Sequence, residues 1–162
     1  MTNYKKAAVF AKPQGESGGY LRALLSLLPD AGIEPYLDRM AAGYFPEGAP
    51  FPVLSDAALG ETCDIALVIG GDGRMLGAAR ALWPHNLPII GINAGRLGFI
   101  TDVTVEDMAR QIPLMLAGHA VKDERRFLFG RIYRDSEEVF SSPAVNDITL
   151  THGHALGMVQ YT

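Results

Sequence analysis

The residues best suited to chemistry lie in a short segment where one carboxylate stands among glycines, Gly70–Gly73. The apolar, β-branched run Ile65–Ile69 precedes it, and residues with good helix propensity follow from Arg74 to Leu82. A tight turn between a strand and a helix needs glycine, because φ can be positive there and a ligand can approach the backbone. The free N–H groups of a helix's first turn commonly bind phosphate. Since an anion sits badly beside a phosphate, Asp72 predicts a metal ligand or a proton acceptor.

Two plainer interpretations of this segment stay open. Aspartate is a favoured N-cap, so Asp72 could serve only to satisfy the first amides of the helix, and the glycines could mark only a close helix–strand crossing. Familiar phosphate loops do not fit, because the P-loop pattern is absent. The dinucleotide fingerprint is off by one residue, since Gly71, Gly73 and Gly77 leave three residues in the last gap. The next strand also ends in Asn93 and not in an acid, which disfavours a nicotinamide dehydrogenase.

The elements that must position this turn follow a repeated strand–loop–helix order. We expect strands at residues 6–11, 33–37, 65–69 and 89–92, and helices at 20–28, 74–82 and from 104 to 118. Residues 38–60 show little periodicity and predict a long, partly mobile loop with one short helical piece near 55–59. This order favours an α/β fold with a doubly wound parallel sheet, whose ligands bind beyond the carboxyl ends of the strands.

From about Lys122 the pattern changes from strand–helix units to alternating strands. Strands are expected at 126–133 and 138–140 around a turn at 134–137, and again at 144–150 and 156–161. We therefore predict a first domain at residues 1–122. Residues 123–162 would be the first strands of an all-β second domain that is cut short.

The composition of the chain excludes several classes of function. The 162 residues are 48% hydrophobic and 20% charged, with a formal net charge of −4. This charge argues against nucleic acid or an anionic membrane as partner, and no apolar run reaches the length of a membrane span. A single cysteine, Cys63, excludes an internal disulfide and predicts a small core residue in a cytoplasmic protein. His152 and His154 could share a strand face, but no third ligand has suitable spacing, so no metal-binding residues are predicted.

Three segments together resemble one family, the bacterial NAD kinases. They are Gly70–Gly73 after an apolar strand, the Gly-Ile-Asn-x-Gly-x-Leu-Gly-Phe pattern of Gly91–Phe99, and the pair Asn146–Asp147. Their order and spacing match the family, as does the flanking run Met75–Arg80. The first segment alone is shared with diacylglycerol-type lipid kinases and phosphofructokinases, whereas the three together are specific.

The resemblance implies transfer of the γ-phosphoryl group of ATP (polyphosphate in some members) to the 2′-hydroxyl of the adenosine ribose of NAD. The product is NADP, and Mg²⁺ or another divalent cation is the implied cofactor. Asp72 matches the residue assigned as general base for that hydroxyl, with a role as Mg²⁺ ligand as the alternative. Gly71 and Gly73 match the backbone that lies against NAD.

The resemblance also implies binding residues further along the chain. Asn146 and Asp147 match a pair that contacts the adenosine portion of NAD, although alone they would be interpreted as a turn that opens a strand. Phe99 matches a position that packs against the nucleotide, and a core role is its alternative. Ala94 stands where some relatives carry a basic residue, and Gly157 where close relatives carry a contacting side chain.

The family's later Asp-Gly and Thr-Pro-Thr-Gly-Ser-Thr-Ala-Tyr segments are missing from this chain. They belong to the second domain and complete the NAD site, so we expect the chain by itself to bind weakly and to lack activity. The full-length family member is expected to be a homo-oligomer, a dimer or tetramer. Two alternatives stay open, a non-catalytic nucleotide-binding or oligomerising module and a diacylglycerol-type lipid kinase domain.

Overall fold

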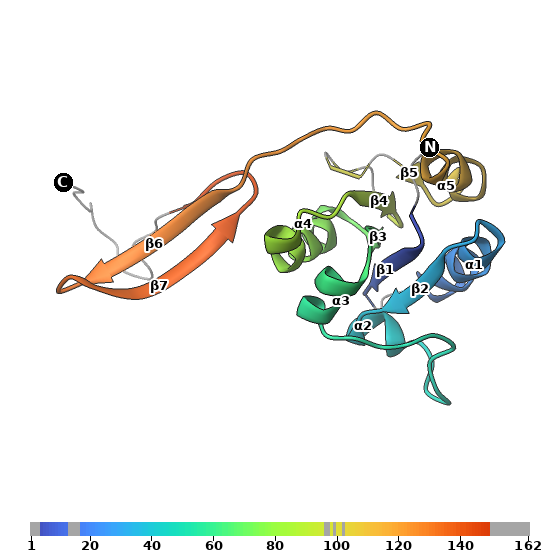
Figure 1. Cartoon of the computed structure of the whole chain (residues 1–162), viewed down its shortest axis with the longest axis horizontal. Coiled ribbons are helices and arrows are strands. Elements are labelled where there is room, and N and C mark those ends of the chain that lie inside the picture. Colours follow the sequence, from blue (N-terminus) through green and yellow to red (C-terminus); the bar gives the residue numbers. More distant parts are fainter. Residues whose placement is uncertain (1–3, 13–16, 96–97, 99, 102, 150–162) are drawn as a thin grey trace. The chain divides into compact units, whose positions relative to one another are not determined.

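The computed structural model of the 162-residue chain describes residues 4–12, 17–95, 98, 100–101 and 103–149. The chain divides into two compact units, Met1–Glu124 and Arg125–Thr162. The first unit carries a five-stranded sheet with its helices, and the second carries a two-stranded hairpin (Figure 1). Within these described residues, no helix has both the length and the apolar character that crossing a bilayer requires.

The sheet of the first unit is parallel throughout. Its strands are β1 (Lys6–Ala11), β2 (Glu34–Leu37), β3 (Ile65–Gly70), β4 (Ile89–Asn93) and β5 (Val103–Thr104). They lie in the order β2-β1-β3-β4-β5. The chain moves from β1 outward to β2 and then returns past β1 to β3. The carboxyl ends of β1 and β3 therefore flank the point where the strand order reverses, and sheets of this order bind ligands there.

Helices cover both faces of this sheet. They are α1 (Ser17–Asp30), α2 (Arg39–Ala42), α3 (Asp56–Thr62), α4 (Asp72–Leu82) and α5 (Met108–Leu116), with a short 3₁₀ helix, η1 (Trp83–His85), after α4. Successive residues of a strand point to opposite faces, so Val9 packs in the apolar cluster of α1 and α5, and Phe10 in that of α3 and α4. Figure 1 shows α1 and α5 on one side of the sheet and α3 and α4 on the other. The predicted doubly wound α/β architecture is confirmed.

Residues 38–60, for which the sequence predicted a long, partly mobile loop with one helical piece, contain α2 near their start and most of α3 at their end. Asp38 caps α2, and its carboxylate accepts hydrogen bonds from two amides of that helix at 3.0 and 3.2 Å. Ser55 caps α3 at the predicted helical piece. Between the two helices, Val53 pairs with Leu37 at the end of β2. The helical piece was therefore predicted, and most of residues 43–55 form a loop as expected. Only α2 was missed, because a helix of four residues is too short to show apolar periodicity.

One strand of the first unit was not predicted. β5 has two residues and pairs with the end of β4, so it carries too little pattern to be recognised. The hydroxyl of Thr104 accepts a hydrogen bond from the N–H of Asp107 at 3.3 Å, but Asp107 and not Thr104 is the N-cap of the next helix, so the helix start predicted at 104 is wrong. The helix itself, α5, begins only at Met108 and continues through Pro113.

The second unit is an antiparallel hairpin of β6 (Leu128–Arg134) and β7 (Glu137–Ala144). Asp135 and Ser136 connect the strands with φ of 49° and 68°, a backbone typical of two-residue hairpin turns, which confirms the turn predicted at 134–137. The strand predicted over 144–150 is wrong for residues 145–149, which follow the end of β7 without strand structure. There the Thr149 hydroxyl donates to the Asp147 carboxylate at 3.1 Å, a local bond that competes with strand pairing. Residues 156–161 lie outside the described residues.

Candidate active site

Asp72 is the first residue of α4, directly after the turn that leaves β3. The N-cap of this helix is Gly71, so the interpretation of Asp72 as the N-cap is wrong. Its carboxylate oxygen Oδ1 accepts a hydrogen bond from the backbone N–H of Ile100 at 3.2 Å. This bond connects α4 to the second glycine-rich loop, 28 residues later in the sequence. The hydrogen bond from Ile100 therefore fixes the orientation of the Asp72 carboxylate through Oδ1.

Gly98 lies against the same carboxylate. A Cβ placed on Gly98 would lie 2.1 Å from Oδ1 and 2.9 Å from Oδ2 of Asp72. A second close approach occurs at Gly91 of β4, where a Cβ would lie 2.9 Å from Cγ2 of the buried Thr101. These two glycines therefore let the loop after β4 lie close to the sheet and reach Asp72.

The glycines of the turn serve different purposes. Gly70 has φ of 155°, and a Cβ there would lie 2.9 Å from Cβ of Arg74, so both backbone and space require glycine. Gly71 and Gly73 are exposed, and a Cβ on either would meet no described atom within 4 Å. The backbone beside Asp72 is thus open to solvent, as the approach of a ligand requires.

A small pocket opens at the carboxyl ends of β4 and β5. Its volume is about 210 Å³, and its lining includes Tyr20 of α1, Asn93 of β4 and Thr104 of β5. Asn93 is buried and accepts a hydrogen bond from the N–H of Gly95 at 2.9 Å. Ala94 also lines the pocket and brings no positive charge to it. Pockets for small molecules commonly have about 300–1,000 Å³, so this one would hold only part of a ligand.

The structure brings together only some of the predicted site residues. Gly71, Asp72 and Gly73 lie in one turn of the first unit. Asn146 and Asp147 belong to the second unit, where they are exposed and follow β7. Phe99 lies outside the described residues.

Two further candidate chemistries concern metal ligands and the single cysteine. No group of three or more His, Cys, Asp or Glu side chains there is arranged to hold a metal ion. Cys63 is buried, and burial raises the pKa of its thiol to about 12. A thiol that stays protonated is a poor nucleophile, which agrees with the predicted core role.

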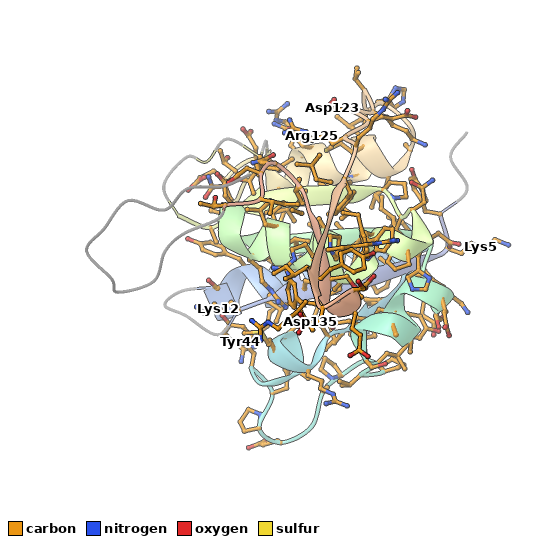
Figure 2. The ribbon with its side chains drawn as sticks, turned by 90° about the vertical axis from the view of Figure 1, so that its left-hand side faces the viewer. Lys5, Lys12, Tyr44, Asp123, Arg125 and Asp135 are labelled. Carbon is orange, nitrogen blue, oxygen red and sulfur yellow. The ribbon has the colours of Figure 1, made fainter. Side chains whose placement is uncertain are left out.

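Sequence reasoning missed a polar cluster at the carboxyl ends of β1 and β2. Arg74, in the first turn of α4, forms an ion pair with the buried Asp38 at the end of β2. Nearby, the Tyr44 hydroxyl donates to the carbonyl of Lys12 at 2.6 Å, and Figure 2 shows these two residues side by side. The sequence could have indicated Asp38 only as a helix-capping residue. Its pairing with Arg74, which lies 36 residues later, leaves no local pattern in the sequence.

The fold and the site define a doubly wound α/β domain with a glycine-rich, carboxylate-bearing turn at the ligand-binding edge of its sheet. Residues 53–120 match the family described as the ATP-NAD kinase N-terminal domain. The NAD kinase of Nitrosomonas europaea is 41% identical over 140 residues, which are 86% of this chain and 47% of that protein. The NAD kinase of Burkholderia cenocepacia is 46% identical over 112 residues, 69% of this chain and 37% of that protein. The chain is therefore related to the bacterial NAD kinases, which confirms the resemblance seen in the sequence.

The chain spans less than half the length of these relatives. A crystal structure of yeast NADH kinase complexed with NADH resembles it with a TM-score of 0.72 at 14% sequence identity. The match covers 86% of this chain and 46% of the yeast chain. At this identity the likeness concerns the fold, and it agrees with a parallel sheet followed by antiparallel strands.

Proposed function

We propose that this chain provides the amino-terminal part of an NAD kinase, which transfers the γ-phosphoryl group of ATP to the 2′-hydroxyl of the adenosine ribose of NAD. The observation that carries the proposal is the Asp72 carboxylate, fixed by the Ile100 amide at the sheet edge where this fold binds ligands. It lies within residues 53–120, which match the ATP-NAD kinase N-terminal domain.

Asp72 acts as the general base in this proposal. A ribose hydroxyl is a poor nucleophile, and a carboxylate within hydrogen-bond reach orients its oxygen and accepts its proton. The oxygen then forms a bond to the γ-phosphorus while the bond from that phosphorus to the bridging oxygen breaks and ADP leaves. Such help typically contributes about 10²–10⁴-fold to the rate. The bond from Ile100 suits the role, because it fixes one carboxylate oxygen and thereby the direction of the group.

Gly71 and Gly73 provide the surface against which the nucleotide lies. Their open backbone and the first amides of α4 favour a bound phosphate or ribose. Mg²⁺, when bound, supplies charge neutralisation on the phosphates of the donor. Proteins hold Mg²⁺ through one or two carboxylates together with substrate phosphates, so Asp72 fits the competing role of metal ligand as well.

Asn146, Asp147 and Phe99 are proposed to complete the NAD site in the whole protein. An amide offers a donor and an acceptor to an adenine edge, and a carboxylate accepts from a ribose hydroxyl or an amino group. The exposure of Ile132 (50%) and Phe140 (56%) supports residues 123–162 as the start of a larger β domain, because an isolated hairpin is marginally stable. A cytoplasmic homo-oligomer is part of the same proposal.

A nucleotide-binding or oligomerising module without turnover is the second candidate. It is favoured by the open backbone of Gly71 and Gly73 before α4, because such a turn can bind a phosphate without a catalytic group. In that case nucleotide would bind at the Asp72 turn, and no NADP would form.

The test compares the 162-residue chain with a fusion, in which the chain is followed by the part of the Nitrosomonas europaea NAD kinase beyond its matched region. NADP formation from NAD, ATP and Mg²⁺ is measured for both, and NAD binding is measured by calorimetry. Activity of the fusion that Asp72→Asn abolishes without loss of NAD binding supports the kinase. A folded fusion that binds NAD without turnover supports the module. A fusion that binds no NAD and phosphorylates diacylglycerol supports the lipid kinase, and either of these two results refutes our proposal.

A further inference from the structure

Asp38 is a buried carboxylate at the carboxyl end of β2. Its side chain is 4% exposed and accepts hydrogen bonds from three backbone amides. Two of these, from Met40 and Ala41, begin α2, and the third, from Ala11 at 3.4 Å, belongs to the end of β1. A buried carboxylate needs such partners, because an unpaired charge away from water is costly. Asp38 therefore connects the ends of two neighbouring strands.

Arg74 reaches this carboxylate from the other side of β1. Its guanidinium lies 5.3 Å from the centre of the Phe10 ring, and Nη2 bonds both to Asp38 and, at 3.4 Å, to the carbonyl oxygen of Ala11. The side chain passes directly over Gly70, where a Cβ would lie 3.2 Å from Cγ of Arg74. It is only 15% exposed, so solvent screens this ion pair little.

The first turn of α4 is consequently tied down at two points. Arg74 ties it to β1 and β2 through Asp38 and Ala11, and Asp72 ties it to the loop after β4 through Ile100. Only one residue separates the two tethered side chains, so a movement of Arg74 moves the backbone that carries Asp72.

We propose that Arg74 and Asp38 are positioning residues, which together fix the turn that carries the Asp72 carboxylate. The inference deepens the proposed function, on which it rests for the meaning of Asp72. Buried ion pairs often add little to stability compared with apolar side chains of similar size. This pair instead defines one position for the turn, because Nη2 of Arg74 bonds to both the Asp38 carboxylate and the Ala11 carbonyl, and three backbone amides hold that carboxylate in place.

The hydrogen bond between Ile100 and Asp72 gives a direct readout on the 162-residue chain. Amide hydrogen exchange of Ile100 is measured by NMR in the parent chain and in Arg74→Gln, Arg74→Lys and Asp38→Asn. Asparagine is as good an N-cap as aspartate, so Asp38→Asn keeps α2 while it removes the charge. Asp72→Ala sets the maximum effect, and Leu67 of β3 reports exchange through global unfolding. Arg110→Gln is the matched control, because it removes an exposed ion pair on α5.

We expect Arg74→Gln and Asp38→Asn to accelerate Ile100 exchange by about tenfold, the effect of weakening a hydrogen bond to a charged group. Arg74→Lys should recover part of the protection, whereas Leu67 in the same variants and Ile100 in Arg110→Gln should change little. Unchanged Ile100 exchange, or equal acceleration at Ile100 and Leu67, would overturn the inference, since the pair would then be absent or merely stabilising.

The fusion separates this inference from the proposed function. If the parent fusion is active, Arg74→Gln should lower kcat by about 10²-fold, the cost of misplacing a group by about 1 Å, with KM for NAD nearly unchanged. A raised KM for NAD with an unchanged kcat would overturn the positioning role. If a folded parent fusion makes no NADP, the proposed function fails, and Ile100 exchange still decides whether the pair fixes the turn.

Discussion

Replacement of Gly98 by alanine tests the geometry of the candidate site most directly. Gly98 lies against the Asp72 carboxylate but has no side chain that could take part in the reaction. Any effect of the substitution on the rate must therefore come from displacement of that carboxylate. A Cβ on Gly98 would lie 2.1 Å from Oδ1, 2.7 Å from Cγ and 2.9 Å from Oδ2 of Asp72. The added methyl group therefore meets the whole carboxylate at once.

The size of the effect follows from these distances. Real contacts of a Cβ are almost never shorter than 3.0 Å, so the methyl group and Oδ1 must separate by about 1 Å. The Asp72 carboxylate is attached to the backbone through Cβ alone, so it can move aside only by rotating its side chain, which weakens its bond from Ile100. A misplacement of about 1 Å costs about 10²-fold in rate, and overpacking costs about 1–3 kcal/mol of stability.

The assay uses the fusion for kcat and the 162-residue chain for urea unfolding. Gly77→Ala is the matched control, because a Cβ there meets no described atom within 4 Å and the residue lies in the middle of α4. It should raise the free energy of unfolding by about 0.5–1 kcal/mol, since alanine is the better helix former. Gly98→Ala should lower kcat by about 10²-fold, and Gly77→Ala should leave it unchanged.

One result would refute the reasoning about this contact. If Gly98→Ala retains the parent kcat and the parent stability, then the Asp72 carboxylate does not lie where the hydrogen bond from Ile100 places it. Equal losses in both variants would instead mean that α4 tolerates no added methyl group, and the special role of Gly98 would be lost.

Three further predictions concern the scaffold. Ser55→Ala should lower the free energy of unfolding by about 1 kcal/mol in urea, because it removes the 3.3 Å bond that caps α3; an unchanged value would show that the cap contributes nothing. Leu67→Ala should cost about 2–5 kcal/mol in the same assay, because Leu67 is fully buried in the central strand, and a loss below 1 kcal/mol would contradict this core. Cys63 should resist iodoacetamide at pH 8 until urea unfolds the chain, as mass spectrometry would show. Since burial raises its pKa from 9.0 to about 12, its contribution to stability should fall as the pH rises from 9 toward 12, where only the unfolded thiol ionises, and rapid alkylation of the folded chain would refute this.

Local patterns in the sequence predicted much of the fold. The first strand at residues 6–11, the strand–turn–helix around Asp72 and the hairpin turn at 134–137 were all predicted close to their observed positions. Each depends on interactions between residues near in sequence, namely apolar periodicity, glycine at a required φ and turn chemistry. The glycine turn with Asp72, together with Gly91–Phe99 and Asn146–Asp147, also indicated the resemblance to NAD kinases, which the comparisons confirmed.

Short elements escaped prediction because they carry too little pattern. The four-residue helix α2 forms because Asp38 caps it, and the two-residue strand β5 forms because it pairs with β4. Neither element is long enough to show a repeating apolar pattern. The strand expected over 144–150 failed for a related reason. Alternation favours an extended backbone, but a strand also needs a neighbour to pair with.

The sequence by itself determined the order of the elements, the glycine turn with Asp72 and the family to which the chain is related. Only the tertiary structure decided which groups surround Asp72. The bond from Ile100 spans 28 residues and that between Arg74 and Asp38 spans 36, and both form because the parallel order β2-β1-β3-β4-β5 brings strand ends to one edge. Such contacts depend on how strands align side by side, and no local pattern of residues encodes that alignment.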